Sequence, residues 1–267
     1  MFTGMSLSKF ERKLGLAWLG LGLLQTLIFL LLSTCYHFGV PGNEIFLPLV
    51  WVWHALIWVI LLRFRALFTR LDGTPLTSLG WPNILTLFRL SSLPALTVLF
   101  LLARDRHELA WPLVIFISIV FLTDLADGYL ARAFNLGSRL GQLIDSSSDY
   151  TILMTLTLIL GVSGVLPTWL LILVLIRLIF QIVGSLLLFW RAKKPLLETT
   201  WLGKASLFAL MVLYALEIMV FLRWHGLSGS AFLQGTEIAA GFIMVISLFD
   251  KARFFYRSLK QPPPEDS

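Results

Sequence analysis

Long apolar runs alternate with short polar segments along almost the whole chain. A run of about 17–25 apolar residues is long enough to cross the hydrocarbon core of a membrane as a helix. Eight such runs occur, at residues 14–33, 46–62, 84–103, 111–131, 139–162, 167–190, 203–222 and 232–250. The pattern predicts an all-α integral membrane protein with eight transmembrane helices, and it leaves no room for a large soluble domain.

Composition agrees with this prediction, because 58% of the residues are hydrophobic, 13% are charged and the mean hydropathy is +0.86. With the N-terminus inside, 16 of the 21 Lys and Arg residues fall in cytoplasmic segments and three on the opposite side. An excess of Lys and Arg marks cytoplasmic loops. We therefore expect a multi-pass cell (inner) membrane protein with both termini in the cytoplasm, whose partner is the lipid bilayer and not a nucleic acid.

The chain divides near Gly80. Residues 1–80 form a predicted two-helix membrane extension that ends in a polar linker, 70–75. Residues 81–258 form a six-helix unit that carries the intramembrane acids of interest, and the short tail 259–267 is expected to be disordered because of its Pro and acidic residues. The single cysteine, Cys35, excludes an intrachain disulfide.

Four aspartates stand out because they lie in apolar segments. Residues 124–149 read D-x2-D-G-x2-A-R-x8-G-x3-D-x3-D, which contains Asp124, Asp127, Asp145 and Asp149. A carboxylate at the centre of a bilayer costs about 2.5–3.5 kcal/mol on insertion scales, so intramembrane acids usually mark a functional site. Carboxylate oxygens suit Mg²⁺ or Mn²⁺, and a pair of such ions is typical of displacement at phosphorus.

Helical spacing predicts that the four acids converge. Asp124, Asp127, Gly128 and Ala131 share one helix face, and Gly141, Asp145 and Asp149 share a face of the next helix. The connection between the two helices is short, so they should be antiparallel neighbours with both faces at the cytoplasmic end. The alternative is a structural network with Arg132 and Arg139, but two arginines cannot neutralise four carboxylates.

The pattern from Asp124 to Asp149 resembles, without a gap or substitution, the signature of the CDP-alcohol phosphatidyltransferase family, closest to its phosphatidylglycerophosphate synthases. The resemblance covers the six-helix unit and implies transfer of a phosphatidyl group from CDP-diacylglycerol to an alcohol, with release of CMP. It implies two divalent cations, a CDP-linked lipid donor, a small alcohol acceptor and a homodimer.

The resemblance also implies residue roles. Asp124, Asp127 and Asp145 are similar to the ligands of the metals that hold the donor pyrophosphate. Asp149 is similar to the base, which faces the second metal and is counted with the metal residues. Further positions resemble the nucleotide and donor pocket: Gly128, Ala131, Arg132, Gly141, Asn83 and Thr86. Asn83 has an alternative role as a helix N-cap after Pro82.

The acceptor is less well specified. Arg177 and Lys204 resemble positions of phosphatidylglycerophosphate synthases, and Arg89 is a cation within a helix, so these three are candidates for the acceptor phosphate, with glycerol 3-phosphate as the first choice. Lys204 can equally be a cytoplasmic flanking residue. Alternatives are an inositol-phosphate acceptor, a CDP-amino-alcohol donor with a diacylglycerol acceptor, and a non-catalytic membrane scaffold.

Overall fold

A computed structural model of the chain describes residues 9–64, 67–70, 73–76, 79–134, 138–192, 201–224 and 226–260, without the side chains of 9, 39–42, 125, 132, 186, 189–192 and 259–260. The described part is helical, and no strand occurs in it. The chain forms two compact units, Met1–Ile152 and Leu153–Ser267, and each is described by itself.

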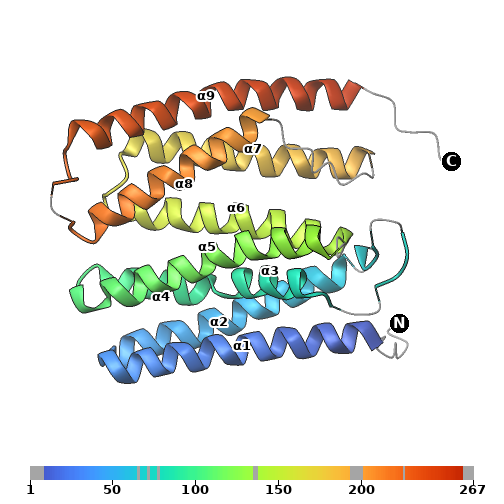
Figure 1. Ribbon diagram of the computed structural model, residues 1–267, viewed down its shortest axis with the longest axis horizontal. Coiled ribbons are helices and arrows are strands. Elements are labelled where there is room, and N and C mark those ends of the chain that lie inside the picture. Colours follow the sequence, from blue (N-terminus) through green and yellow to red (C-terminus); the bar gives the residue numbers. More distant parts are fainter. Residues whose placement is uncertain are drawn as a thin grey trace. The chain divides into compact units, whose positions relative to one another are not determined.

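Eight helical spans in the described residues are long and apolar enough to cross a membrane, which confirms the prediction of eight transmembrane helices. The third span consists of two helices that meet at Ser92, where a single helix was predicted. The helices, labelled in Figure 1, are α1 (Lys9–Tyr36), α2 (Gly39–Arg63), α3 (Trp81–Ser91), α4 (Leu93–Ala103), α5 (Ala110–Ala133), α6 (Arg139–Val162), α7 (Thr168–Ala192), α8 (Trp201–Phe221) and α9 (Ala231–Lys260), with a 3₁₀ turn η2 (His107–Leu109) before α5.

Proline explains the break between α3 and α4. Pro94 has no backbone N–H, so it cannot donate the helical hydrogen bond to the carbonyl of Leu90, four residues earlier. The indole of Trp53, on α2, donates to that carbonyl instead, at 2.8 Å. The backbone N–H of Ser92 is shared between the carbonyls of Phe88 and Arg89. The break is therefore stabilised by a residue from the predicted N-terminal extension.

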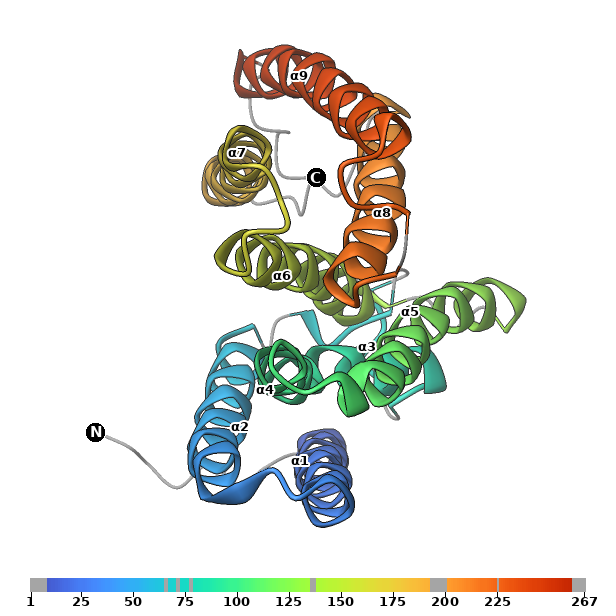
Figure 2. The same ribbon diagram turned by 90° about the vertical axis from the view of Figure 1, so that its left-hand side faces the viewer.

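In the first unit, α1 and α2 form a helical hairpin that packs against α3 and α4, while α5 packs against α3 (Figure 2). Two glycines of α1 allow the close approach of α2. Gly15 lies against the ring of Trp58, and Gly22 lies against the rings of His54 and Trp51. The compact unit thus includes the hairpin, and its boundary falls at Ile152 within α6 and not near Gly80. Residues 1–80 are predicted to be an extension because they lie outside the family resemblance. The division into compact units does not test that prediction.

The predicted linker is joined to the start of α6. Arg70 and Ser138 form an isolated antiparallel β-bridge, and the N–H of Arg139 donates to the carbonyl of Thr69 at 3.1 Å. Because the first N–H groups of a helix have no partner within the helix, this contact satisfies one of them. Thr69, the residue just before the polar linker, therefore caps the helix that carries Asp145 and Asp149.

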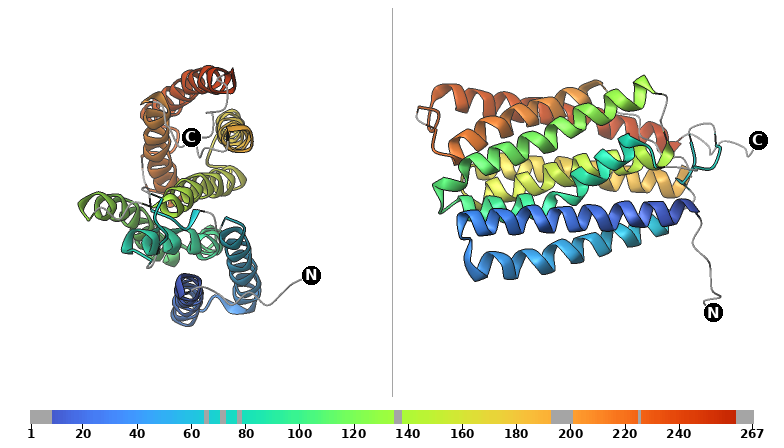
Figure 3. Two further views of the ribbon diagram at one scale, coloured as in Figure 1. Left: turned by 90° about the vertical axis from the view of Figure 1, so that its right-hand side faces the viewer. Right: turned by 60° about the horizontal axis from the view of Figure 1, so that its bottom comes forward.

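The second unit contains the end of α6 together with α7, α8 and α9. Helix α9 packs against both α7 and α8 (Figure 3). The hydroxyls of Thr157 on α6 and Tyr214 on α8 share a short hydrogen bond. Helix α9 continues to Lys260, so the first two residues of the predicted tail are helical, and residues 261–267 lie outside the described part.

The packing of α7 on α9 generates a stability prediction. A Cβ on Gly184 would lie within 3.0 Å of the ring of Phe255, too close without a shift. Gly184→Val should therefore destabilise the protein by about 1–3 kcal/mol, seen as a lower thermal midpoint in detergent. Gly235→Val is the matched control, because a Cβ on Gly235 meets no heavy atom within 4 Å. Equal midpoints for the two variants would contradict this account of the interface.

Candidate active site

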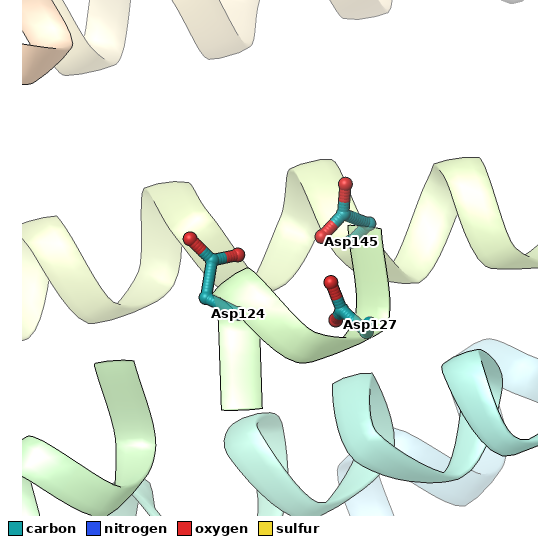
Figure 4. Close-up of side chains that lie close together, drawn as sticks. All are labelled: Asp124, Asp127 and Asp145. Carbon is teal, nitrogen blue, oxygen red and sulfur yellow. The ribbon is translucent and has the colours of Figure 1, made fainter. Parts of the chain in front are cut away.

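Helices α5 and α6 bring the predicted acids together within the first unit. Asp124 and Asp127 lie three residues apart on α5, and Asp145 and Asp149 lie four residues apart on α6. One carboxylate oxygen from each of Asp124, Asp127 and Asp145 lies within 4.8 Å of the others, and the three side chains converge in Figure 4. The predicted convergence of two helix faces is therefore observed for these three acids.

Arg89, on the last turn of α3, lies among all four acids. Its guanidinium forms an ion pair with Asp124 and lies 2.5 Å from an oxygen of Asp145, 3.2 Å from one of Asp149 and 3.7 Å from one of Asp127. The side chain of Arg89 is fully buried. Arg89 was expected at an acceptor phosphate, whereas here it partners the carboxylates. Its contact with an acceptor stays a prediction.

The cluster carries excess negative charge. Four carboxyl side chains face one arginine, and these four are the acids that pair with Arg89 in the described part of the chain. The cluster is accessible at Asp145, whose side chain is 47% exposed, whereas the side chain of Asp127 is only 7% exposed. Several hard oxygen ligands with unbalanced negative charge and an open side fit Mg²⁺ or Mn²⁺, which bind carboxylates together with water and substrate phosphates.

Two hydroxyl groups orient the charged groups. Thr86, on α3, donates to a carboxylate oxygen of Asp127 at 2.8 Å, and its hydroxyl also lies 2.9 Å from the carbonyl of Pro82. Ser148, on α6, accepts from Nε of Arg89 at 2.9 Å. Sequence reasoning missed Ser148, although it lies seven residues after Gly141 and so on the same face as Asp145 and Asp149.

Asn83 and Gly141 meet at the start of α6. The hydroxyl of Ser138 accepts from the N–H of Gly141 at 2.9 Å and lies 3.3 Å from the side-chain oxygen of Asn83. A Cβ on Gly141 would come within 3.0 Å of both side chains, so glycine is required for this approach. Asn83 is the third residue of α3 and not its N-cap, which is Gly80.

The remaining residues of the predicted nucleotide pocket lie on the last turns of α5. Gly128 and Ala131 are half-buried, and the side chain of Arg132 lies outside the described part. Arg139 is exposed at the start of α6 and has no ion pair with an acid within the described residues. The described residues therefore give no support to the alternative in which Arg139 neutralises the acids.

Two of the three predicted acceptor cations, Arg177 and Lys204, lie in the second unit. Arg177, buried on α7, donates to the hydroxyl of Ser206 and to the carbonyl of Gly203 at the start of α8. Lys204 is exposed on the same turn of α8. Lys251, buried on α9, was missed because a lysine at the cytoplasmic end of a span is typical of a flanking residue.

Lys251 is an unusual cation. Its Nζ donates no hydrogen bond within the described residues. It lies 5.5 Å from the ring centre of Phe254, and both Arg177 and the neighbouring Asp250 act on it electrostatically. Arg177 and Lys251 are therefore two buried cations that interact within the second unit.

The acid cluster predicts a metal-binding defect. Asp124→Asn and Asp145→Asn keep the side-chain shape and remove one charge each. Each substitution should therefore lower the affinity for Mn²⁺ by at least about tenfold. Free Mn²⁺ measured by electron paramagnetic resonance in titrations of the purified protein reports this affinity directly. Asp105→Asn, which removes an exposed acid outside the spans, serves as control. Unchanged Mn²⁺ affinity in both cluster variants would contradict the metal site.

Comparisons with known proteins agree with the geometry. A Mycobacterium tuberculosis protein provisionally named a cardiolipin synthase is 36% identical over 133 residues, which are 49% of this chain and 60% of that protein. A Cereibacter sphaeroides protein named CDP-diacylglycerol–glycerol-3-phosphate 3-phosphatidyltransferase is 37% identical over 139 residues, which are 51% of this chain and 61% of that protein. A Salmonella choleraesuis protein with the same name is 31% identical over 140 residues, 50% of this chain and 74% of that protein.

The chain thus spans about three fifths of the first two relatives. No solved structure matches it. Residues 79–249, more than half of the chain, match the family described as CDP-alcohol phosphatidyltransferase, and the chain belongs to that family.

Proposed function

We propose that the protein transfers a phosphatidyl group from CDP-diacylglycerol to glycerol 3-phosphate and releases CMP. The observation that carries this proposal is the convergence of Asp124, Asp127 and Asp145, from the family region of the chain, around a charge deficit that suits divalent cations. Relatives named as glycerol-3-phosphate phosphatidyltransferases support the choice of substrates.

The residues of the first unit would bind the donor. Asp124, Asp127 and Asp145 would hold two cations, Mg²⁺ or Mn²⁺, against the pyrophosphate, with Thr86 fixing the orientation of Asp127. Such cations neutralise negative charge on the phosphoryl oxygens when bound. We assign the cytidine pocket to Gly128, Ala131 and Arg132 on the family resemblance, together with the neighbouring Asn83 and Gly141.

Asp149 is proposed as the general base. Asp149 does not belong to the close group formed by Asp124, Asp127 and Asp145. One of its carboxylate oxygens lies 3.2 Å from the guanidinium of Arg89. The acceptor oxygen forms a bond to the phosphorus that carries diacylglycerol, its proton passes to the carboxylate of Asp149, and the bond from that phosphorus to the CMP oxygen breaks. A base separate from the ligands leaves the donor bound while the proton moves.

The acceptor phosphate is proposed to bind Arg177 and Lys251, with Lys204 contributing from the exposed turn of α8. The support is the charge and burial of Arg177 and Lys251 within the second unit. A phosphate monoester carries about −1.5 to −2 charges at neutral pH, which balances two cations. This charge match favours glycerol 3-phosphate over an uncharged acceptor such as diacylglycerol.

A second candidate is cardiolipin synthesis, favoured by the cardiolipin synthase names of the mycobacterial relative and of a Streptomyces coelicolor relative that is 32% identical over 146 residues. Its acceptor would be phosphatidylglycerol, whose phosphodiester carries one negative charge, whereas a phosphate monoester carries about −1.5 to −2. The donor and the roles of the acids would be unchanged.

Purified full-length protein given labelled CDP-diacylglycerol tests the proposal. With Mg²⁺ or Mn²⁺ present, glycerol 3-phosphate should yield CMP and phosphatidylglycerophosphate, and phosphatidylglycerol should yield little product. Cardiolipin formation from phosphatidylglycerol alone would support the second candidate. Transfer to neither acceptor, with inositol phosphate and diacylglycerol also inert, would overturn the proposed activity.

We further propose that both termini and the active site face the cytoplasm, on the placement of Lys and Arg described above. This orientation would let a soluble phospho-alcohol and released CMP exchange with the cytoplasm, while the acyl chains of the donor stay in the bilayer. A homodimer is proposed on the family resemblance alone.

The role of Asp149 predicts a separation of turnover from binding. Asp149→Asn should lower kcat by about 10²–10⁴-fold, the usual contribution of a general base, and keep most of the affinity for the CDP-linked donor. CMP release and calorimetric titration with donor measure the two quantities. Asp124→Asn is the comparison, since it should lose donor binding. An equally severe loss of donor binding in Asp149→Asn would make Asp149 a ligand instead.

The acceptor proposal predicts a selective change in KM. Arg177→Gln and Lys251→Gln should each raise the KM for glycerol 3-phosphate about ten- to hundredfold, because a hydrogen bond to a charged group contributes about 1.5–3 kcal/mol. Donor binding should stay nearly unchanged. Lys204→Gln should have a smaller effect because Lys204 is exposed, and Arg253→Gln on the exposed side of α9 is the control. An unchanged acceptor KM in both buried-site variants would rule out this phosphate site.

A further inference from the structure

Polar side chains of the α1–α2 hairpin contact the core at the α3–α4 break. Gln25 of α1 donates to the hydroxyl of Ser92 at 2.8 Å, and the ring of His54 of α2 lies 2.9 Å from the hydroxyl of Ser91. The indole of Trp53 donates to the carbonyl of Leu90 at 2.8 Å. Three consecutive residues at the α3–α4 break thus each bind a different side chain of the hairpin.

These contacts are fully enclosed. Gln25, His54, Ser91 and Ser92 are all at most 2% exposed. Much of the hairpin surface is apolar and exposed, for example Leu16, Val52 and Val59, as expected of helices that face lipid. A hairpin that only anchored the protein would not need polar groups buried against α3. We call the set Gln25, Trp53 and His54 the hairpin clamp.

The histidine of the clamp has a defined hydrogen-bond direction. Nδ1 of His54 lies 2.8 Å from the carbonyl of Val50, and a carbonyl only accepts, so Nδ1 carries the proton. In the neutral ring Nε2 then accepts from the hydroxyl of Ser91. Ser92 in turn donates to the carbonyl of Phe88 on α3. The clamp therefore continues into the hydrogen bonds of the last turn of α3.

That last turn carries Arg89. The carbonyl of Arg89 accepts from the N–H of Ser92, and its side chain is the cation among the four acids. A shift or rotation of the end of α3 would move this guanidinium relative to Asp124 on α5 and Asp145 on α6. Supporting groups beyond the ligands commonly set the position and electrostatics of a metal site in this way.

We propose that the hairpin clamp is a positioning device for the active site, which fixes the end of α3 so that Arg89 stays among the carboxylates. Gln25, Trp53 and His54 act through Arg89 and touch no substrate. The inference rests on the proposed function for its effect on turnover, but its effect on cation binding follows from the positions of Arg89 and the acids alone.

The sign of the expected effect separates positioning from simple damage. A cation inside a carboxylate cluster opposes the binding of another cation. Arg89→Gln should therefore raise the affinity for Mn²⁺ while lowering turnover. A loosened clamp should do the same more weakly, because Arg89 no longer sits firmly among the acids. Partial unfolding of the site would instead lower the Mn²⁺ affinity and turnover together.

The experiment is a double-mutant cycle on the full-length protein. The clamp variant Gln25→Leu/His54→Phe, Arg89→Gln and the combination are compared with the wild type by Mn²⁺ titration and CMP release. We expect the clamp variant to bind Mn²⁺ about two- to tenfold more tightly and to lose about tenfold in kcat. Adding the clamp substitutions to Arg89→Gln should change neither the Mn²⁺ affinity nor kcat any further, because the clamp acts through the Arg89 side chain that this variant lacks.

Two matched controls isolate the clamp. Thr26→Val lies beside Gln25, but its hydroxyl bonds only within α1, to the carbonyl of Gly22. Trp58→Phe is the control for Trp53→Phe, because both substitutions remove an indole from α2. Trp58 packs against Trp18, within the hairpin. If the double substitution fails to fold, Trp53→Phe replaces it, since the ring is kept and only the indole N–H is lost.

Additive effects of the clamp and Arg89→Gln, lower Mn²⁺ affinity in the clamp variants, or equal effects of the controls would each overturn the positioning role. A wild type that binds Mn²⁺ but transfers to neither acceptor would overturn the proposed function, and the Mn²⁺ cycle would still decide the clamp.

Discussion

The repulsion among four carboxylates that face one buried arginine is the constraint on which the rest of the first unit depends. Two unit charges 4 Å apart interact by about 4 kcal/mol at the effective dielectric typical of a protein surface, and three of these acids have oxygens within 4.8 Å of one another. Arg89 offsets part of this repulsion, and Thr86 and Ser148 hold the charged groups in place by hydrogen bonds. The remaining negative charge suits divalent cations, so the repulsion that destabilises the cluster also supports the proposed binding of a metal there.

The side-chain contacts between α3 and the start of α6 show how the helices support this arrangement. Gly141 allows Asn83 and Ser138 to approach the first turn of α6, and Asp145 and Asp149 follow on the same face. Thr69, just before the linker, accepts a hydrogen bond from the start of α6. Side chains that sequence reasoning assigned to a nucleotide pocket therefore also hold α6 in register with the helix that carries Arg89, and a substitution at Asn83 or Gly141 would disturb both roles.

Helical periodicity was sufficient to predict the eight spans and the convergence of the acids, because both depend on spacing within single helices. The partners of Arg89 were not predictable, since a buried cation requires an anion but its sequence position does not say which one. Lys251 was hidden by its place at the end of a span, where lysine is ordinary. Two features had readable signals. Pro94 cannot donate to the carbonyl of Leu90 and so indicates a helix break just before it, and Ser148 recurs at helical spacing from Gly141.

The N-terminal hairpin and the α3–α4 break depend on each other. Without the hairpin, the hydroxyls of Ser91 and Ser92 and the carbonyl freed by Pro94 would face hydrocarbon, where each unsatisfied polar group costs several kcal/mol. Without the break, Gln25, Trp53 and His54 would be buried with no partners on α3. The family match begins at residue 79, so one half of this complementary pair lies outside it. The polar groups at the α3–α4 break therefore require partners such as those of the hairpin. Through the break, the hairpin is connected to Arg89, the cation that partly neutralises the acids.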